Sequence, residues 1–126
     1  MNYSKQKEKI YQVVCNNPIH MTAEQVLTKV NELDTNSSQA TIYRNLTKLV
    51  DDGMLRKITI AGEPDRFDGN VNIHGHFYCI NCKKVYDFEI NNAIIKQIQS
   101  STKHKIMDSD LIFYGICMDC IGGKND

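Results

Sequence analysis

Four of the five cysteines form two Cys-x-x-Cys pairs, Cys79/Cys82 and Cys117/Cys120. Two residues between ligands allow a tight turn to point both thiolates at one ion, and two such pairs supply the ligands of a tetrahedral zinc site. Two disulfides or a redox-active Cys-x-x-Cys motif are the alternatives, but disulfides are rare in the reducing cytoplasm. The pairs therefore predict zinc. The fifth cysteine, Cys15, lies in an apolar helical stretch and is expected to be a buried packing residue.

A second group of metal-capable residues combines histidines with carboxylates. His74 and His76 are one residue apart, so on a strand both imidazoles point to the same face. Asp68 lies at the end of a predicted hairpin, Asp87 on a later predicted strand, and His20 between two predicted helices. These donors suit Fe, Mn, Zn or Ni. Each residue alone is more often part of an ordinary polar surface than a metal ligand, so the residues by themselves leave both interpretations open.

Length and composition limit what can position these residues. The chain has 126 residues, of which 41% are hydrophobic and 24% charged, so it fits one ordinary domain or two small ones and not a disordered chain. No apolar run approaches the about 20 residues of a membrane helix. The polar start MNYSKQKEKIYQ does not resemble a signal peptide, so a cytoplasmic location is expected. The net charge is zero, so nucleic-acid binding has to be inferred from motifs.

The first half of the sequence predicts three helices followed by a hairpin. The first helix is expected over 5–16, the second after the N-cap Thr22, and the third over 39–52. Residues 55–60 alternate like a strand, and a turn and a return strand follow. This is the element order of a winged helix-turn-helix, although a three-helix bundle with a solvated polar face fits the same periodicity.

The third predicted helix carries the candidate DNA contacts. Ser38 is its expected N-cap and Gly53 its terminator. Its apolar face is predicted to consist of Ala40, Tyr43, Leu46, Leu49 and Val50. A helix fits the major groove, where Arg and Asn can bind guanine and adenine edges. The side chains available to DNA are Thr41, Tyr43, Arg44, Asn45 and Lys48.

The second half predicts strands at 77–79 and 85–88, a helix from Asn91 or Asn92 to about 102, and a long strand over 105–116. This half is small for an independent core, so zinc and pairing with a second copy are expected to stabilise it. The predicted fold class is α+β: a winged helix-turn-helix at 1–68, a linker at 69–73, and a small α/β dimerisation domain with a four-cysteine zinc site at 74–126.

Together these motifs resemble the ferric uptake regulator family of metal-dependent repressors, over nearly the whole chain. The combination is specific in order and spacing. Its anchors are His20 with residues 22–24, residues 40–46 (ATIYRNL), 66–68 (RFD), 74–82 (HGHFYCINC), 85–88 (VYDF) and 114–120 (YGICMDC).

The resemblance implies a metal-dependent transcriptional repressor that binds double-stranded DNA at a palindromic operator as a homodimer. It implies structural Zn²⁺ on the four cysteines and regulatory Fe²⁺ or Mn²⁺ on a second site. One ion bonded to both halves would fix their angle and favour the DNA-competent geometry. The implied regulatory ligands are His20, Asp68, His74, His76 and Asp87.

Two residues favour different branches of the family. Asp87 is similar to the peroxide-sensing branch, because iron-uptake regulators usually have glutamate there. That branch implies iron-catalysed oxidation of a ligating histidine, at His20 or His74. Arg44 is similar to the iron-uptake branch, so an iron-responsive uptake regulator is the alternative. By the same resemblance the chain begins after an N-terminal helix that commonly touches DNA, so operator contacts are expected to differ.

Other classes of protein have weaker support in the sequence. A zinc hydrolase needs an open metal position and a general base, and the sequence has neither H-E-x-x-H nor the deaminase H-x-E with P-C-x-x-C. An enzyme is therefore not expected. A zinc-ribbon interaction module without DNA binding would use the second half alone.

Overall fold

The structure is a computed structural model that describes residues 2–17, 19–33, 36–71 and 75–122. The chain divides into two compact units, residues 1–71 and 72–126. The division falls within the predicted linker. Among the described residues, no helix is both long enough and apolar enough to cross a membrane.

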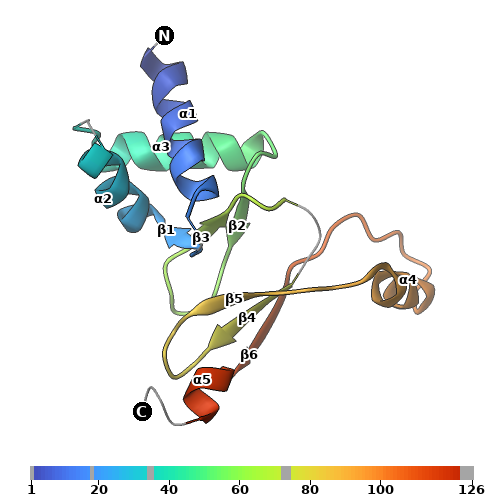
Figure 1. Ribbon diagram of the computed structural model, residues 1–126. Coiled ribbons are helices and arrows are strands. Elements are labelled where there is room, and N and C mark those ends of the chain that lie inside the picture. Colours follow the sequence, from blue (N-terminus) through green and yellow to red (C-terminus); the bar gives the residue numbers. More distant parts are fainter. Residues whose placement is uncertain (1, 18, 34–35, 72–74, 123–126) are drawn as a thin grey trace. The chain divides into compact units, whose positions relative to one another are not determined.

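The first unit is a winged helix-turn-helix. It contains the helices α1 (Asn2–Cys15), α2 (Ala23–Leu33) and α3 (Gln39–Asp51). Its sheet has the order β1-β3-β2 and is antiparallel throughout, with β1 (Met21–Thr22), β2 (Arg56–Ile58) and β3 (Arg66–Asp68) (Figure 1). The predicted three helices and hairpin are confirmed. The two-residue strand β1 was not predicted, because so short a segment has no periodicity of its own.

The helix ends follow the capping signals in the sequence. The Thr22 backbone N–H donates to Gln25 Oε1 at 2.9 Å, and the Gln25 N–H donates to Thr22 Oγ1 at 3.2 Å, which is a capping box. Ser38 Oγ accepts from the backbone N–H of Thr41 at 3.2 Å and begins α3. Gly53 has a φ of 77° directly after the C-cap of α3, in the left-handed region that ends helices.

The face of α3 that packs into the core differs from the prediction. Its buried residues are Ile42, Asn45, Leu46 and Leu49, whereas Ala40 and Tyr43 are exposed. Leu46 and Leu49 are buried as predicted, but Ile42 and the polar Asn45 are buried in place of Ala40 and Tyr43. The core of the unit also contains Ile10, Val13, Val14, Met21, Ala23, Val26, Val30, Leu55 and Phe67.

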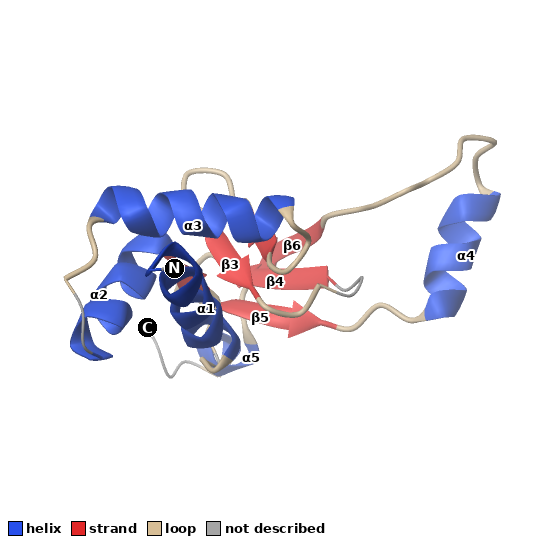
Figure 2. Ribbon diagram, turned by 90° about the horizontal axis from the view of Figure 1, so that it is seen from above, coloured by secondary structure: helices blue, strands red, loops and turns tan. Residues whose placement is uncertain are grey.

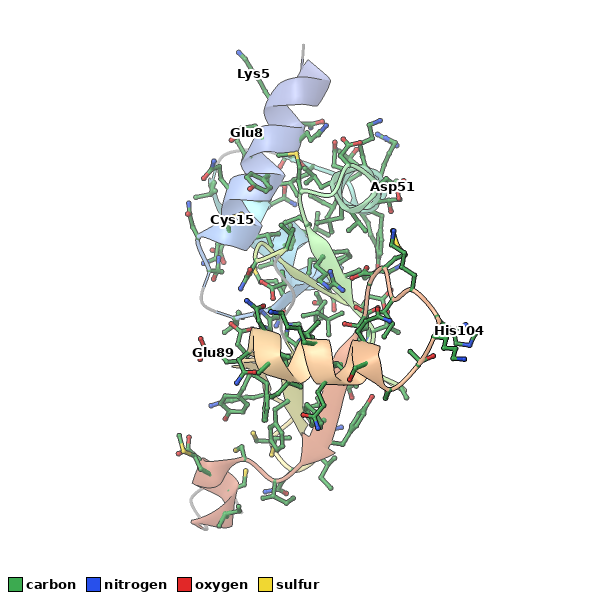
Figure 3. The ribbon with its side chains drawn as sticks, turned by 90° about the vertical axis from the view of Figure 1, so that its right-hand side faces the viewer. Lys5, Glu8, Cys15, Asp51, Glu89 and His104 are labelled. Carbon is green, nitrogen blue, oxygen red and sulfur yellow. The ribbon has the colours of Figure 1, made fainter. Side chains whose placement is uncertain are left out.

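Cys15 is not the buried packing residue that was expected. It is exposed at the end of α1, one position beyond the core residue Val14 (Figure 3). Its sulfur nevertheless lies against the chain at Gly69, where an added Cβ would be 2.7 Å from Cys15 Sγ. Residue 69 therefore packs closely against the C-terminal end of α1.

The second unit is a three-stranded mixed sheet with two helices. The strands are β4 (Gly75–Cys79), β5 (Val85–Phe88) and β6 (Leu111–Gly115), in the order β5-β4-β6. Strand β4 is antiparallel to β5 and parallel to β6. The helices are α4 (Asn92–Ser100), which has Asn91 as its N-cap, and α5 (Met118–Ile121).

The long strand predicted over 105–116 is wrong in its first half. Residues 105–110 form no strand, and β6 begins only at Leu111. Side chains satisfy the backbone there instead of a neighbouring strand. The Ile106 N–H donates to Gln99 Oε1 at 2.9 Å, and the Ser109 N–H donates to Asp108 Oδ1 at 2.8 Å.

The second unit lacks a conventional apolar core among its described residues. Its buried cluster consists of Cys79, Cys117 and Cys120, with Phe77, Cys82 and Tyr86 packed against it. Figure 2 shows α4 apart from the strands, joined to β5 and β6 by extended segments, and none of its residues is buried. The cysteines therefore occupy the place of a core.

Candidate metal centres and recognition helix

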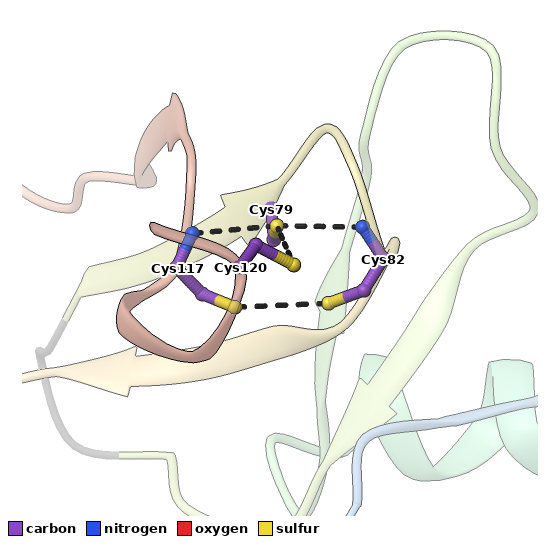
Figure 4. Close-up of side chains that lie close together, drawn as sticks. All are labelled: Cys79, Cys82, Cys117 and Cys120. Carbon is purple, nitrogen blue, oxygen red and sulfur yellow. Dashed lines mark hydrogen bonds between the residues drawn. The ribbon is translucent and has the colours of Figure 1, made fainter. Parts of the chain in front are cut away.

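The four paired cysteines converge at one end of the second sheet. Cys79 ends β4, and Cys117 follows β6 by two residues. Because β4 and β6 are parallel, their C-terminal ends lie at the same edge of the sheet, which brings together pairs that are far apart in sequence. The four sulfurs lie within 4.8 Å of one another (Figure 4).

The sulfur separations are those of metal ligands and not of disulfides. The sulfurs of Cys79 and Cys120 are 3.7 Å apart, and those of Cys82 and Cys117 are 3.8 Å apart. A disulfide requires about 2.05 Å. Four sulfurs at about 2.3 Å from a tetrahedral zinc ion are separated from one another by about 3.8 Å. The cluster therefore fits zinc with all four positions filled, which is the coordination of a structural site.

Backbone amides point at this cluster. The N–H groups of Cys82 and Cys117 donate to Cys79 Sγ at 3.4 and 3.3 Å. Burial alone would raise the pKa of Cys79, but these bonds and one from the Asn81 backbone lower it to about 6. The Lys84 backbone lowers the pKa of Cys82, but burial and hydrogen bonds with the other three cysteines raise it to about 11. Crowded thiolates repel one another, and a divalent cation allows all four to be deprotonated together.

Sequence reasoning missed Tyr86, which packs against the cysteine cluster. The Cys117 side chain raises the pKa of Tyr86 well above its usual range, and the Tyr86 side chain lowers the pKa of Cys117. The available signal was the strand alternation, which points Tyr86 to the opposite face from Asp87.

The histidine–carboxylate residues form one close pair within the first unit. His20 directly precedes β1, and Asp68 ends β3. The antiparallel register pairs Met21 with Phe67, so one further step brings His20 beside Asp68. His20 Nε2 lies 3.7 Å from Asp68 Oδ2, while Asp68 Oδ1 accepts from the Asn70 N–H at 2.9 Å. The unpredicted strand β1 is thus what positions His20.

A second pair lies within the second unit. His76 on β4 is the register partner of Asp87 on β5, and His76 Nε2 is 3.6 Å from Asp87 Oδ1. The predicted ligand His74 lies outside the described residues. Each pair offers an imidazole nitrogen and a carboxylate oxygen, which are donors for borderline divalent ions.

The side chains of α3 that are candidates for DNA contact lie in different environments. Arg44, Lys48 and Tyr43 are exposed, with Tyr43 50% exposed. Thr41 lies at the N-terminal turn, where its Oγ1 accepts from Ser38 Oγ at 3.0 Å. These positions are compatible with groove contacts.

Asn45 is a correction to the candidate DNA contacts. Its side chain is fully buried, and Nδ2 donates to the Thr41 carbonyl at 3.0 Å. A buried amide that is bonded to its own helix cannot reach a base edge. The prediction of a direct contact by Asn45 is therefore wrong, and its role is in the packing of α3.

Residues 1–114 match the sequence model of the ferric uptake regulator family. The chain belongs to the ferric uptake regulator family. As a member, it is a metal-responsive transcription regulator and not an enzyme.

Individual ferric uptake regulator relatives agree with this assignment. The peroxide-responsive repressor PerR of Staphylococcus aureus is 30% identical over 117 residues, which cover 91% of this chain and 79% of that protein. The Campylobacter jejuni peroxide stress regulator shares the fold, with a TM-score of 0.81 and 18% identity over 94% of this chain and 91% of that one. The Helicobacter pylori ferric uptake regulator, described as having three functional metal-binding sites, has a TM-score of 0.81 and 21% identity over 93% and 80% of the two chains.

Proposed function

We propose that this protein is a homodimeric, metal-dependent repressor that binds a palindromic operator and releases it in response to peroxide. The observation that carries DNA binding is the arrangement of α3, which buries its apolar residues and leaves Tyr43, Arg44 and Lys48 exposed. A helix presented by a winged helix-turn-helix enters the major groove, where Arg binds guanine bidentately. Because the net charge is zero, binding depends on these contacts and on two copies acting together.

The second unit supports the homodimer. Phe88 and Phe113 are each 44% exposed and their ring centroids are 4.9 Å apart, while Ile94 and Ile98 of α4 are also exposed. Exposed apolar side chains of this kind mark an interaction site. A second copy would cover it by symmetry and would present two recognition helices to the two halves of a palindrome.

In this proposal the four cysteines hold structural zinc, and the two histidine–aspartate pairs with His74 hold one regulatory Fe²⁺ or Mn²⁺ ion. His20 and Asp68 belong to the first unit, and His76 and Asp87 belong to the second. An ion bonded to both pairs would stabilise one arrangement of the units relative to others, by as much as its affinity for the two arrangements differs.

Peroxide sensing rests on Asp87 and on the similarity to peroxide-responsive relatives. A ferrous ion held by these residues would catalyse the oxidation of a ligating imidazole by peroxide, which would transfer one oxygen atom to the ring and leave as water. Oxidation of His20 or His74 to 2-oxo-histidine adds one oxygen atom to the ring and makes it a poorer ligand. The metal bridge proposed between the units would then open and DNA would be released. Manganese would support DNA binding but respond poorly to peroxide.

Mass spectrometry of the iron-loaded protein after mild peroxide tests the sensing step, with operator binding measured on the same samples. We expect a gain of one oxygen on His20 or His74 in proportion to DNA release, with a manganese-loaded control unchanged. Retention of the operator with unmodified histidines would instead assign iron-responsive regulation, which Arg44 favours. A folded, zinc-loaded protein that binds no DNA with either metal would be an interaction module.

A further inference from the structure

A side chain of α2 holds the backbone just before α3. Asn31 Nδ2 donates to the Ser37 carbonyl at 3.2 Å, and the Ser37 N–H donates to Asn31 Oδ1 at 2.8 Å. One amide side chain thus satisfies both backbone groups of the residue that precedes the N-cap Ser38. Because Ser38 begins α3, this pairing ties the start of α3 to α2.

Hydrogen bonds between side chains continue from this cap along α3. Ser38 Oγ accepts from the Thr41 backbone N–H at 3.2 Å and donates to Thr41 Oγ1 at 3.0 Å. Thr41 Oγ1 also accepts from Arg44 Nη2 at 3.5 Å. A hydroxyl oxygen has two lone pairs, so Ser38 and Arg44 together occupy both acceptor sites of Thr41. The three side chains form a polar chain that starts at the cap of α3 and ends at Arg44.

We propose that Thr41 is a positioning residue for DNA recognition, which holds the Arg44 guanidinium on the exposed surface of α3 before DNA arrives. A mobile arginine side chain has to be ordered when it binds, and ordering it in advance avoids part of that cost. The guanidinium has five N–H donors, so one bond to Thr41 leaves enough for a bidentate contact with guanine. The inference rests on the base contact of Arg44 in the proposed function.

Thr41→Val removes the hydroxyl and keeps a β-branched side chain of similar size, while the backbone N–H that Ser38 caps remains. We expect the manganese-loaded variant to lose about 2- to 5-fold in operator affinity relative to unrelated DNA, because the bond from Arg44 is long and exposed and so lies at the low end for a hydrogen bond. Thr41→Ser retains the hydroxyl and should behave like the wild type. The matched control is Thr47→Val, at an exposed threonine of the same helix, which should leave the affinity ratio unchanged.

A double-mutant cycle separates positioning from direct contact. If Thr41 acts through Arg44, Thr41→Val has no further effect on discrimination in an Arg44→Ala protein. Equal losses from Thr41→Val in both backgrounds would mean that Thr41 binds DNA itself or acts only on the fold. That result overturns the inference and leaves the Arg44 contact intact. If Arg44→Ala alone keeps wild-type discrimination, the base contact of the proposed function fails, and the inference fails with it.

A second measurement needs no DNA. In the zinc-loaded protein, NMR relaxation of the Arg44 Nε–H group should show a more ordered side chain in the wild type than in Thr41→Val. Thr47→Val should resemble the wild type. Equal order in all three proteins would show that Thr41 does not hold the guanidinium, and would overturn the inference whatever the binding data.

Discussion

His76 and Asp87 face each other as register partners across β4 and β5, with Nε2 and Oδ1 3.6 Å apart. The strand pairing thus places the His76 imidazole beside the Asp87 carboxylate. A single methylene group sets the length of the Asp87 side chain. A change in that length alters the position of the donor oxygen without altering its charge. Asp87 is therefore the residue at which the proposed peroxide response is best tested.

Asp87→Glu should keep metal-dependent DNA binding but reduce sensitivity to peroxide, because the longer side chain moves the carboxylate relative to the ion. The measurement is the peroxide concentration that releases half of the operator from iron-loaded protein. Glu89→Asp, an exposed carboxylate just beyond β5, serves as the control (Figure 3). Unaltered sensitivity in Asp87→Glu would argue against a role for carboxylate length in sensing.

Replacing any one of the four clustered cysteines with serine should lower zinc content and weaken the dimer. The cysteines form the buried cluster of the second unit, so the loss of one ligand removes both metal and packing. Elemental analysis and analytical ultracentrifugation measure the two effects. Cys15→Ser is the matched control, because Cys15 is exposed in the first unit. Wild-type levels of folded dimer in zinc-free protein would contradict the prediction.

Arg44→Ala should reduce discrimination between the operator and unrelated DNA by roughly 1–3 kcal/mol, the value of one bidentate base contact. Tyr43→Ala should weaken operator binding. Asn45→Ala should instead act through stability, because the Asn45 side chain is buried. Fluorescence anisotropy at fixed salt and thermal unfolding distinguish these effects. Tight binding of the wild-type protein to any DNA duplex in the absence of metal would contradict the proposal of sequence-specific, metal-dependent binding.

Lys83→Gly should stabilise the second unit by about 0.5–1 kcal/mol. Lys83 has a φ of 68°, in the left-handed region that favours glycine, and its N–H donates to the Cys79 carbonyl at 2.8 Å. Glycine relieves the backbone strain, and its greater freedom in the unfolded chain offsets part of the gain. Denaturant unfolding of zinc-loaded protein measures the change, with Lys84→Gly as the control that should not stabilise.

Gly69→Ala should destabilise the first unit by no more than about 1 kcal/mol, because the obstructing sulfur is the end of an exposed side chain. The added methyl would lie 2.7 Å from Cys15 Sγ, so the sulfur or the chain has to move. Cys15→Ala in the same protein should restore most of the lost stability. A double-mutant cycle of unfolding free energies tests the coupling between the two positions. If the two substitutions change the free energy of unfolding additively, the Cys15 sulfur is not what opposes the methyl group at position 69.

Local signals in the sequence predicted much of the fold. Thr22 with Gln25 and Ser38 with Thr41 satisfy backbone groups within a few residues, so the helix starts did not depend on distant packing. The four cysteines were also predictable, because their spacing reflects the coordination geometry of the metal. The capping signals and the spacing within each Cys-x-x-Cys pair are short-range features of the sequence.

The errors concern features decided by distant partners. Strand β1 forms only because β3 is available to pair with it, and Tyr86 packs against the cysteine cluster only through the pairing of β5 with β4. The burial of Asn45 was not predicted, because Asn45 is a polar residue within the apolar stripe of α3. Residues 105–110 were predicted to be part of a strand, but neighbouring side chains satisfy parts of their backbone.

The joining of two distant Cys-x-x-Cys pairs at one sheet edge has a consequence for newly made protein. Cys117 is 35 residues after Cys82. At about 5–20 residues per second, a ribosome adds it roughly 2–7 s later. During that interval the nascent chain carries two of its four sulfur ligands, and β4 lacks its parallel neighbour β6. Metal that arrives before the second pair meets a half-built site, so correct loading depends on the timing of synthesis as well as on affinity.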